Sequence, residues 1–170
     1  MKGETPAMQV YLLRHGVAEE GRVGSNDADR ALTAYGRRKL RQVLKMASEA
    51  GVAPTLILSS PLKRAMQTAQ IARQVLGYKN DILRTKALAP GAGVHDVWEE
   101  IRVHQDEASL LLVGHNPLFG ELAAYLLGDA KIEIDFKKGA IFRVDIENFP
   151  PRPKGILRWY LTARLAADRG

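Results

Sequence analysis

The chain contains no cysteine among its 170 residues. This absence excludes disulfide bonds, thiolate metal sites and a cysteine nucleophile. Long hydrophobic runs are also lacking, since the longest apolar stretch, residues 109–113, is far too short to span a bilayer. Residues 1–7 contain no apolar segment of the kind found in a signal peptide. Together these absences predict a cytoplasmic protein with no membrane partner.

Aromatic residues make up only 6% of the chain and are not interleaved with basic residues, as they are in proteins that bind single-stranded nucleic acids. The net charge is nevertheless +6, from 25 Lys and Arg against 19 Asp and Glu. The densest basic run, residues 37–45, lies in a predicted amphipathic helix with Leu40, Val43, Leu44 and Ala47 as its apolar stripe. Its basic side chains are therefore expected to face solvent, and we predict no nucleic-acid partner.

Length and composition are those of one ordinary globular domain. The chain is 46% hydrophobic and 26% charged, and its length lies in the usual range for one domain. No internal repeat or inter-domain linker is visible. We therefore predict a single catalytic domain over residues 1–170, with residues 1–7 as a loose N-terminal extension.

Short apolar segments alternate with helical patterns along the chain. Strands are expected at residues 9–13, 56–58, 82–88, 110–113, 140–146 and 156–162, and helices at residues 34–51, 61–76, 94–104 and 118–127. The last two strands flank a Pro-rich turn, which is typical of an antiparallel hairpin. This order predicts an α/β three-layer sandwich, with a mostly parallel central sheet, helices on both faces and a C-terminal antiparallel hairpin.

Three polar clusters each follow an apolar strand directly. They are Arg14-His15-Gly16, Ser60 to Arg64, and Gly114-His115-Asn116. In open α/β sheets, ligands bind outside the carboxyl ends of the strands. If the three strands are neighbours, two histidines and two arginines converge on one pocket. Such a pocket suits phosphoryl transfer, because arginines can hold phosphoryl oxygens while an imidazole acts as nucleophile.

The same segments resemble motifs of the histidine-phosphatase superfamily. Arg14-His15-Gly16 after the first strand resembles its signature tripeptide, and Leu32-Thr33-x-x-Gly36 is similar to the start of its first long helix. Residues 59–69 resemble the second phosphate-arginine segment, and residues 113–117 the second histidine segment. The segments occur in the family's order, and the resemblance spans residues 8–162. The short length and the Gly-His-Asn-Pro sequence are most similar to SixA-type phosphohistidine phosphatases.

The resemblance implies a role for each matching residue. His15 is the implied nucleophile, which attacks phosphorus in line. Arg14 and Arg64 are the implied clamps on the phosphoryl oxygens, each through paired charge-assisted hydrogen bonds. His115 is expected to donate to another phosphoryl oxygen, and the backbone amide of Asn116 to add a further donor. No metal or other cofactor is implied, because water hydrolyses the phosphorylated enzyme.

One departure from the family bears on the substrate. Many members that cleave phosphate esters carry a glutamate acid in the loop after the third strand, but residues 86–93 contain no carboxylate. The nearest alternatives are Asp96, Glu99 and Glu100, with Glu19 as a weaker candidate. An alkoxide needs a proton to leave, which is worth about 10²–10⁴-fold in rate. An imidazole leaves more easily, because its conjugate acid has a pKa near ~6.5.

The absent acid therefore favours phosphohistidine as the substrate. The predicted function is that of a metal-independent phosphatase, which forms a phosphohistidine intermediate and hydrolyses phosphohistidine on a signalling protein. Two alternatives stay open: a small-molecule ester phosphatase with Glu19 or Asp96 as acid, and a non-catalytic phosphate-binding module. The predicted partner is accordingly a phosphorylated protein or a small phosphorylated metabolite, and we expect a monomer.

Overall fold

A computed structural model describes residues 6–167 of the chain, in which one sheet has the strand order β3-β2-β4-β1-β5-β6. The strands are β1 (Met8–Arg14), β2 (Leu56–Ser59), β3 (Leu83–Arg84), β4 (Ser109–Gly114), β5 (Ile141–Ile146) and β6 (Ile156–Leu161). The first four run parallel, while β5 is antiparallel to β1 and β6 to β5. The mostly parallel sheet and the C-terminal hairpin are therefore confirmed. Of the predicted N-terminal extension, residues 1–5 lie outside the described residues.

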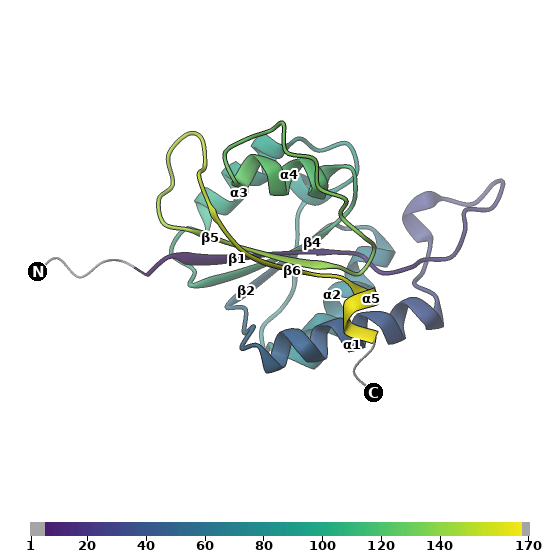
Figure 1. Ribbon diagram of the computed structural model, residues 1–170. Coiled ribbons are helices and arrows are strands. Elements are labelled where there is room, and N and C mark those ends of the chain that lie inside the picture. The colour runs from purple at the N-terminus through teal and green to yellow at the C-terminus, as the bar shows by residue number, and fades with distance from the viewer. Residues whose placement is uncertain (1–5, 168–170) are drawn as a thin grey trace, which may run out of the picture.

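Helices cover both faces of the sheet (Figure 1). One face packs against α1 (Ala34–Glu49), α2 (Lys63–Leu76) and α5 (Ala163–Ala167), and the other against α3 (Val94–Val103) and α4 (Leu118–Leu126). Two short 3-10 helices, η1 (Asp27–Asp29) and η2 (Lys86–Leu88), lie in connections. This arrangement confirms the predicted three-layer sandwich. Within residues 6–167, no helix is both long and apolar enough to cross a membrane.

The central strands are apolar throughout because both of their faces are covered. In β1, Val10 and Leu12 point into the core beneath α3 and α4, whereas Tyr11 and Leu13 point into the core beneath α1 and α2. All four side chains are buried. Alternating residues of a strand face opposite sides of the sheet, so a two-sided core needs an unbroken apolar run.

The first long helix forms as its sequence predicts and supports the segment after β1. The Thr33 hydroxyl accepts the Gly36 N–H at 2.9 Å, which caps the helix. The apolar stripe is buried, and Arg38, Arg41 and Lys45 are exposed, as expected. A Cβ at Gly36 would collide with the Val17 carbonyl. The helix therefore packs directly on the chain that leaves β1.

The third predicted strand is the main error in the predicted elements. The sequence predicts a strand over residues 82–88, but only Leu83 and Arg84 form one, and η2 follows. The Thr85 hydroxyl caps this turn by accepting the Ala87 N–H at 3.1 Å, and Leu88 becomes completely buried. The Thr85 cap and the burial of Leu88 therefore stabilise a 3-10 turn here in place of a longer strand. The C-terminal α5 was not predicted, because its five residues are too few for a helical pattern.

Candidate active site

The three polar clusters meet at one edge of the sheet. Strand β4 lies between β1 and β2, and the register sets Arg14 beside Gly114 and Ser59 beside Val113. The backbone continues this alignment past the strand ends, since the His15 N–H donates to the Gly114 carbonyl at 3.0 Å. The hypothesis that the three strands are neighbours is confirmed. Their carboxyl ends lie at the right of Figure 1, near the projecting loop between β1 and α1.

His15 is buried, with 6% of its surface exposed, and its tautomer is set by the backbone. Its Nδ1 lies 2.8 Å from the Gly16 carbonyl oxygen, which can only accept, so Nδ1 carries the proton and Nε2 keeps a lone pair. Burial is the main cause that lowers the pKa of His15 to about 3, and the nearby charges of Arg64 and Arg14 act in the same direction. At neutral pH the ring is therefore uncharged, with its single proton on Nδ1, which leaves Nε2 free to act as a nucleophile.

His115 lies beside His15, with the ring centroids 5.1 Å apart. Its Nε2 is 2.7 Å from the Ser60 hydroxyl, which already accepts the Leu62 N–H at 3.3 Å. Burial, followed by the charge of Arg64, lowers the pKa of His115 to about 4, so the ring is neutral. We assign the serine proton to the bond with Nε2, and hence the proton of His115 to Nδ1. Ser60 belongs to the segment that resembles the second phosphate-arginine motif, but sequence reasoning assigned its hydroxyl no role, because only the fold brings it to His115.

Arg64 lies in the first turn of α2, with only 6% of its side chain exposed. Its Nη1 donates to the Asp27 carbonyl at 3.0 Å, and its Nη2 to the Asp27 carboxylate at 3.2 Å. Arg30 binds the same carboxylate at 2.8 Å. Slight desolvation acts to raise the pKa of Asp27, but Arg30 and Arg64 outweigh it and lower the pKa. Sequence reasoning missed Asp27, because only the fold brings this loop to Arg64.

Arg14 is held differently, by a neutral acceptor. Its Nη1 donates to the Phe136 carbonyl at 2.6 Å, and Asn116 Nδ2 donates to the same oxygen at 3.0 Å. The Asn116 side chain also accepts the Gly120 N–H at 3.2 Å, so it ties chain segments together. Within residues 6–167, no hydrogen bond uses the Asn116 backbone N–H, the donor that the sequence prediction assigned to substrate.

Three nitrogen atoms of the site lack a hydrogen-bond acceptor although they are buried. Across the described residues, four buried side-chain atoms have no partner, and three of them are Arg14 Nε, Arg64 Nε and His115 Nδ1. An unsatisfied buried donor costs about 1–3 kcal/mol, so such a cluster calls for a functional explanation. Arg14 ends β1, His115 directly follows β4, and Arg64 lies in the first turn of α2, just after β2. A phosphoryl group carries acceptor oxygens of the kind that these nitrogens lack.

The predicted acid candidates do not contact these residues. The Asp96 carboxylate accepts the Gly93 N–H at 3.0 Å, and the Glu99 carboxylate accepts from Arg102 at 2.8 Å. Glu100 lies 3.7 Å from His104, and Glu19 is exposed. In the part of the chain that the structure describes, no group of three or more His, Cys, Asp or Glu side chains could hold a metal ion.

Comparison with known proteins identifies the family. Residues 10–89 match the family model of the histidine phosphatase superfamily, branch 1. A phosphohistidine phosphatase SixA homolog from Haemophilus influenzae is 34% identical over 130 residues, which cover 71% of this chain and 78% of that protein. The chain belongs to the histidine phosphatase superfamily. It is accordingly a hydrolase of the phosphatase class.

Solved structures agree with this assignment. This phosphatase superposes on the protein histidine phosphatase SixA complexed with tungstate with a TM-score of 0.83 and 27% identity, covering 92% of this chain and 98% of that one. A phosphohistidine phosphatase SixA described as putative, from Agrobacterium tumefaciens, gives a TM-score of 0.80 and 26% identity, covering 93% and 99%. The fold and the family predicted from the motifs are thus confirmed.

Proposed function

We propose that this phosphatase hydrolyses phosphohistidine on a signalling protein, through a phosphorylated His15 and without a metal, in a single catalytic domain. The observation that carries the proposal is the set of three unpartnered buried nitrogens, on Arg14, Arg64 and His115, together with the neutral imidazole of His15. The donors can form hydrogen bonds with phosphoryl oxygens, and His15 Nε2 supplies the lone pair that attacks phosphorus. The names of the SixA relatives support the choice of phosphohistidine.

The first chemical step is attack on phosphorus by His15 Nε2. The new N–P bond forms in line with the breaking bond between phosphorus and the leaving nitrogen, which takes the bonding electron pair. Arg14, Arg64 and His115 hold the phosphoryl oxygens as charge spreads over them in the transition state. The proton on His15 Nδ1 stays on its bond to the Gly16 carbonyl, which stabilises the ring as it gains positive character.

Water completes the reaction. Its oxygen attacks the phosphorus of the phosphorylated imidazole, the N–P bond breaks, and its electrons return to Nε2 as the lone pair. The products are inorganic phosphate and the starting form of His15, so neither a redox partner nor a metal enters the balance. The same two arginines serve both steps, because each transition state places negative charge on the same three oxygens.

The leaving group is the feature that favours phosphohistidine over a phosphate ester. Of the carboxylates in residues 6–167, only Asp27 is bonded to a proposed catalytic side chain. Its pKa is lowered, so at neutral pH it is ionised and has no proton to donate. An imidazole leaving group tolerates this, since its nitrogen can pick up a proton from water, whereas an alkoxide leaves poorly without an acid.

Trapping the intermediate tests the nucleophile. Wild-type protein is mixed with a peptide carrying ³²P-phosphohistidine, quenched within one turnover and digested, and the label is located. We expect it on His15. His15→Ala should lose about 10⁴-fold or more in turnover and all labelling, while circular dichroism stays unchanged. His95→Ala, which alters an exposed imidazole, is the matched control. Label on another residue, or an active His15→Ala protein, would refute the proposal.

A series of leaving groups separates phosphohistidine from ester substrates. We expect kcat/KM to fall steeply as leaving-group basicity rises, with phosphohistidine peptides best, aryl phosphates intermediate and alkyl phosphates nearly inert. Glu19→Gln, Asp96→Asn and Glu99→Gln should each change turnover of the phosphohistidine peptide by less than about threefold. A flat series, with one amide variant losing about 10²-fold on alkyl phosphates, would establish an ester phosphatase with its own acid.

A further inference from the structure

The segment between α4 and β5 contributes a carbonyl to the site. The Phe136 oxygen accepts from Arg14 Nη1 at 2.6 Å and from Asn116 Nδ2 at 3.0 Å. A carbonyl oxygen has two lone pairs, so these two donors use its full capacity. The position of this one oxygen therefore determines how the Arg14 guanidinium is oriented.

Tyr160 holds the backbone on both sides of that carbonyl. Its hydroxyl donates to the Asp135 carbonyl at 2.9 Å and accepts the Lys137 N–H at 2.8 Å. Phe136 lies between these two contacts in the chain. Burial raises the pKa of Tyr160, so its hydroxyl keeps its proton and can serve as the donor. The two hydrogen bonds of the Tyr160 hydroxyl therefore hold the backbone immediately before and after Phe136, whose carbonyl accepts from Arg14.

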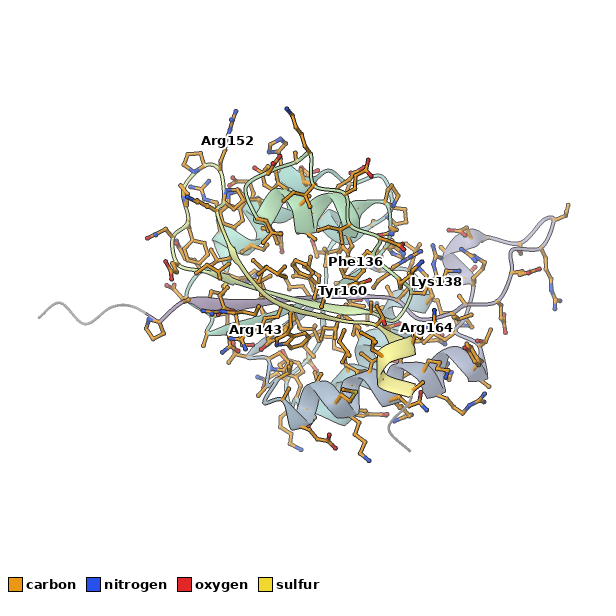
Figure 2. The ribbon with its side chains drawn as sticks, viewed as in Figure 1. Phe136, Lys138, Arg143, Arg152, Tyr160 and Arg164 are labelled. Carbon is orange, nitrogen blue, oxygen red and sulfur yellow. The ribbon has the colours of Figure 1, made fainter. Side chains whose placement is uncertain are left out.

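The rings of Phe136 and Tyr160 also pack against each other, and this contact holds the segment in the core. Phe136 is completely buried, and its ring centroid lies 5.4 Å from that of Tyr160. Figure 2 shows the two labelled residues together in the centre of the molecule. Tyr160 is paired with Phe142 in the hairpin, at the sheet edge farthest from β3. Rigid packing and two hydrogen bonds thus fix the Phe136 carbonyl relative to the sheet.

We propose that Tyr160 is a positioning residue of the active site, which orients Arg14 for the phosphoryl group by holding the Phe136 carbonyl. The inference rests on the proposed function, since it presumes that Arg14 binds phosphate. It assigns the C-terminal hairpin a part in catalysis that none of the sequence motifs indicates. Within residues 6–167, the hydroxyl of Tyr160 bonds only the backbone of Asp135 and Lys137, so its proposed effect passes through the Phe136 carbonyl to Arg14.

The test is a double-mutant cycle read by phosphate binding and turnover. Tyr160→Phe removes the hydroxyl and keeps the ring. We expect it to weaken competitive inhibition by inorganic phosphate, and to lower kcat/KM, each by about tenfold, because small displacements of a clamp are costly. In an Arg14→Ala background the same substitution should change both quantities by less than about twofold, since its target is gone.

Tyr125→Phe is the matched control, because its hydroxyl bonds His95 on the surface, away from Arg14. Thermal unfolding of each variant verifies that it is folded at the assay temperature. Equal losses from Tyr160→Phe in both backgrounds, or no loss in the wild-type background, would overturn the inference. If Arg14→Ala alone left phosphate inhibition unchanged, the proposed anion site itself would be wrong. The two failures are therefore distinguishable.

Discussion

Arg14 and Arg64 carry the same functional group but are held by opposite parts of the molecule. Arg14 is fixed by the neutral Phe136 carbonyl, which belongs to a completely buried residue. Arg64 is fixed by Asp27, whose side chain is 63% exposed and which lies in the connection between β1 and α1. A neutral acceptor leaves the charge of Arg14 intact, whereas a carboxylate partly neutralises Arg64. An incoming anion therefore meets one arginine that is held ready by a neutral group, Arg14, and one that is already paired with a carboxylate, Arg64.

Lysine substitutions of the two arginines should have the largest effect on activity, and their response to a change at Asp27 should distinguish Arg64 from Arg14. Arg64→Lys and Arg14→Lys are each expected to lower kcat/KM by about 10²–10³-fold, because an ammonium cannot make a planar two-pronged contact. The new lysine at position 64 is also expected to pair with Asp27. Asp27→Asn should therefore raise activity several-fold more in the Arg64→Lys protein than in the Arg14→Lys protein. Equal recovery of activity in the two lysine variants would show that Asp27 does not act on Arg64 in particular.

The pH dependence of stability should be the next largest effect. In the unfolded chain, histidines titrate near ~6.5, but His15 and His115 have pKa values of about 3 and about 4 in the folded chain. At pH values between the folded and the unfolded pKa of each histidine, the unfolded state binds more protons than the folded state. The free energy of unfolding therefore falls as pH drops below ~6.5. Each histidine adds a slope of about 1.4 kcal/mol per pH unit.

Urea unfolding of the wild type and of His15→Ala between pH 4.5 and 7 measures this slope, which should be shallower in the variant by one histidine's share. Proton NMR titration then compares the arginines. Because the charge of Arg64 lowers the pKa of His115 more than that of Arg14 does, Arg64→Ala should raise that pKa further than Arg14→Ala. The reverse order would contradict the geometry.

A smaller loss is expected at Ser60, on the Arg64 side of the site. Ser60→Ala removes the hydroxyl that bonds His115 Nε2, and kcat/KM should fall by about tenfold. Ser109→Ala serves as control, since it removes another buried hydroxyl at the opposite end of β4. Steady-state kinetics on a phosphohistidine peptide measure both. Equal losses would mean that Ser60 acts through packing alone.

The smallest effect, of opposite sign, is expected at Asp27. Asp27→Asn keeps an oxygen that can accept from Arg64 but removes the charge, so inorganic phosphate should inhibit about two- to fivefold more strongly at low salt. The gain should shrink as ionic strength rises, because the carboxylate is exposed. Weaker inhibition by phosphate would show that Asp27 orients Arg64 more than it competes with the anion.

Much of the fold could be predicted because its signals are local. The cap at Thr33 and the apolar stripe of α1 are readable within one helix, and the two-sided burial of β1 follows from an unbroken apolar run. The outer strand β3 was predicted too long, since its end depends on Leu88 turning into the core. Convergence of the clusters could be predicted only on condition that β1, β2 and β4 are neighbours, which the sheet order supplies.

The sequence by itself determined the chemical groups available to the site. They are two histidines and two arginines placed directly after or near the ends of apolar strands, and residues 86–93 contain no carboxylate. Only the tertiary structure decided what holds each group. Asp27 is 37 positions from Arg64, and the Phe136 carbonyl is 122 positions from Arg14. Neither Asp27 nor a backbone carbonyl belongs to a motif. Such contacts depend on how strands and loops pack in space, and a linear pattern carries no record of that packing.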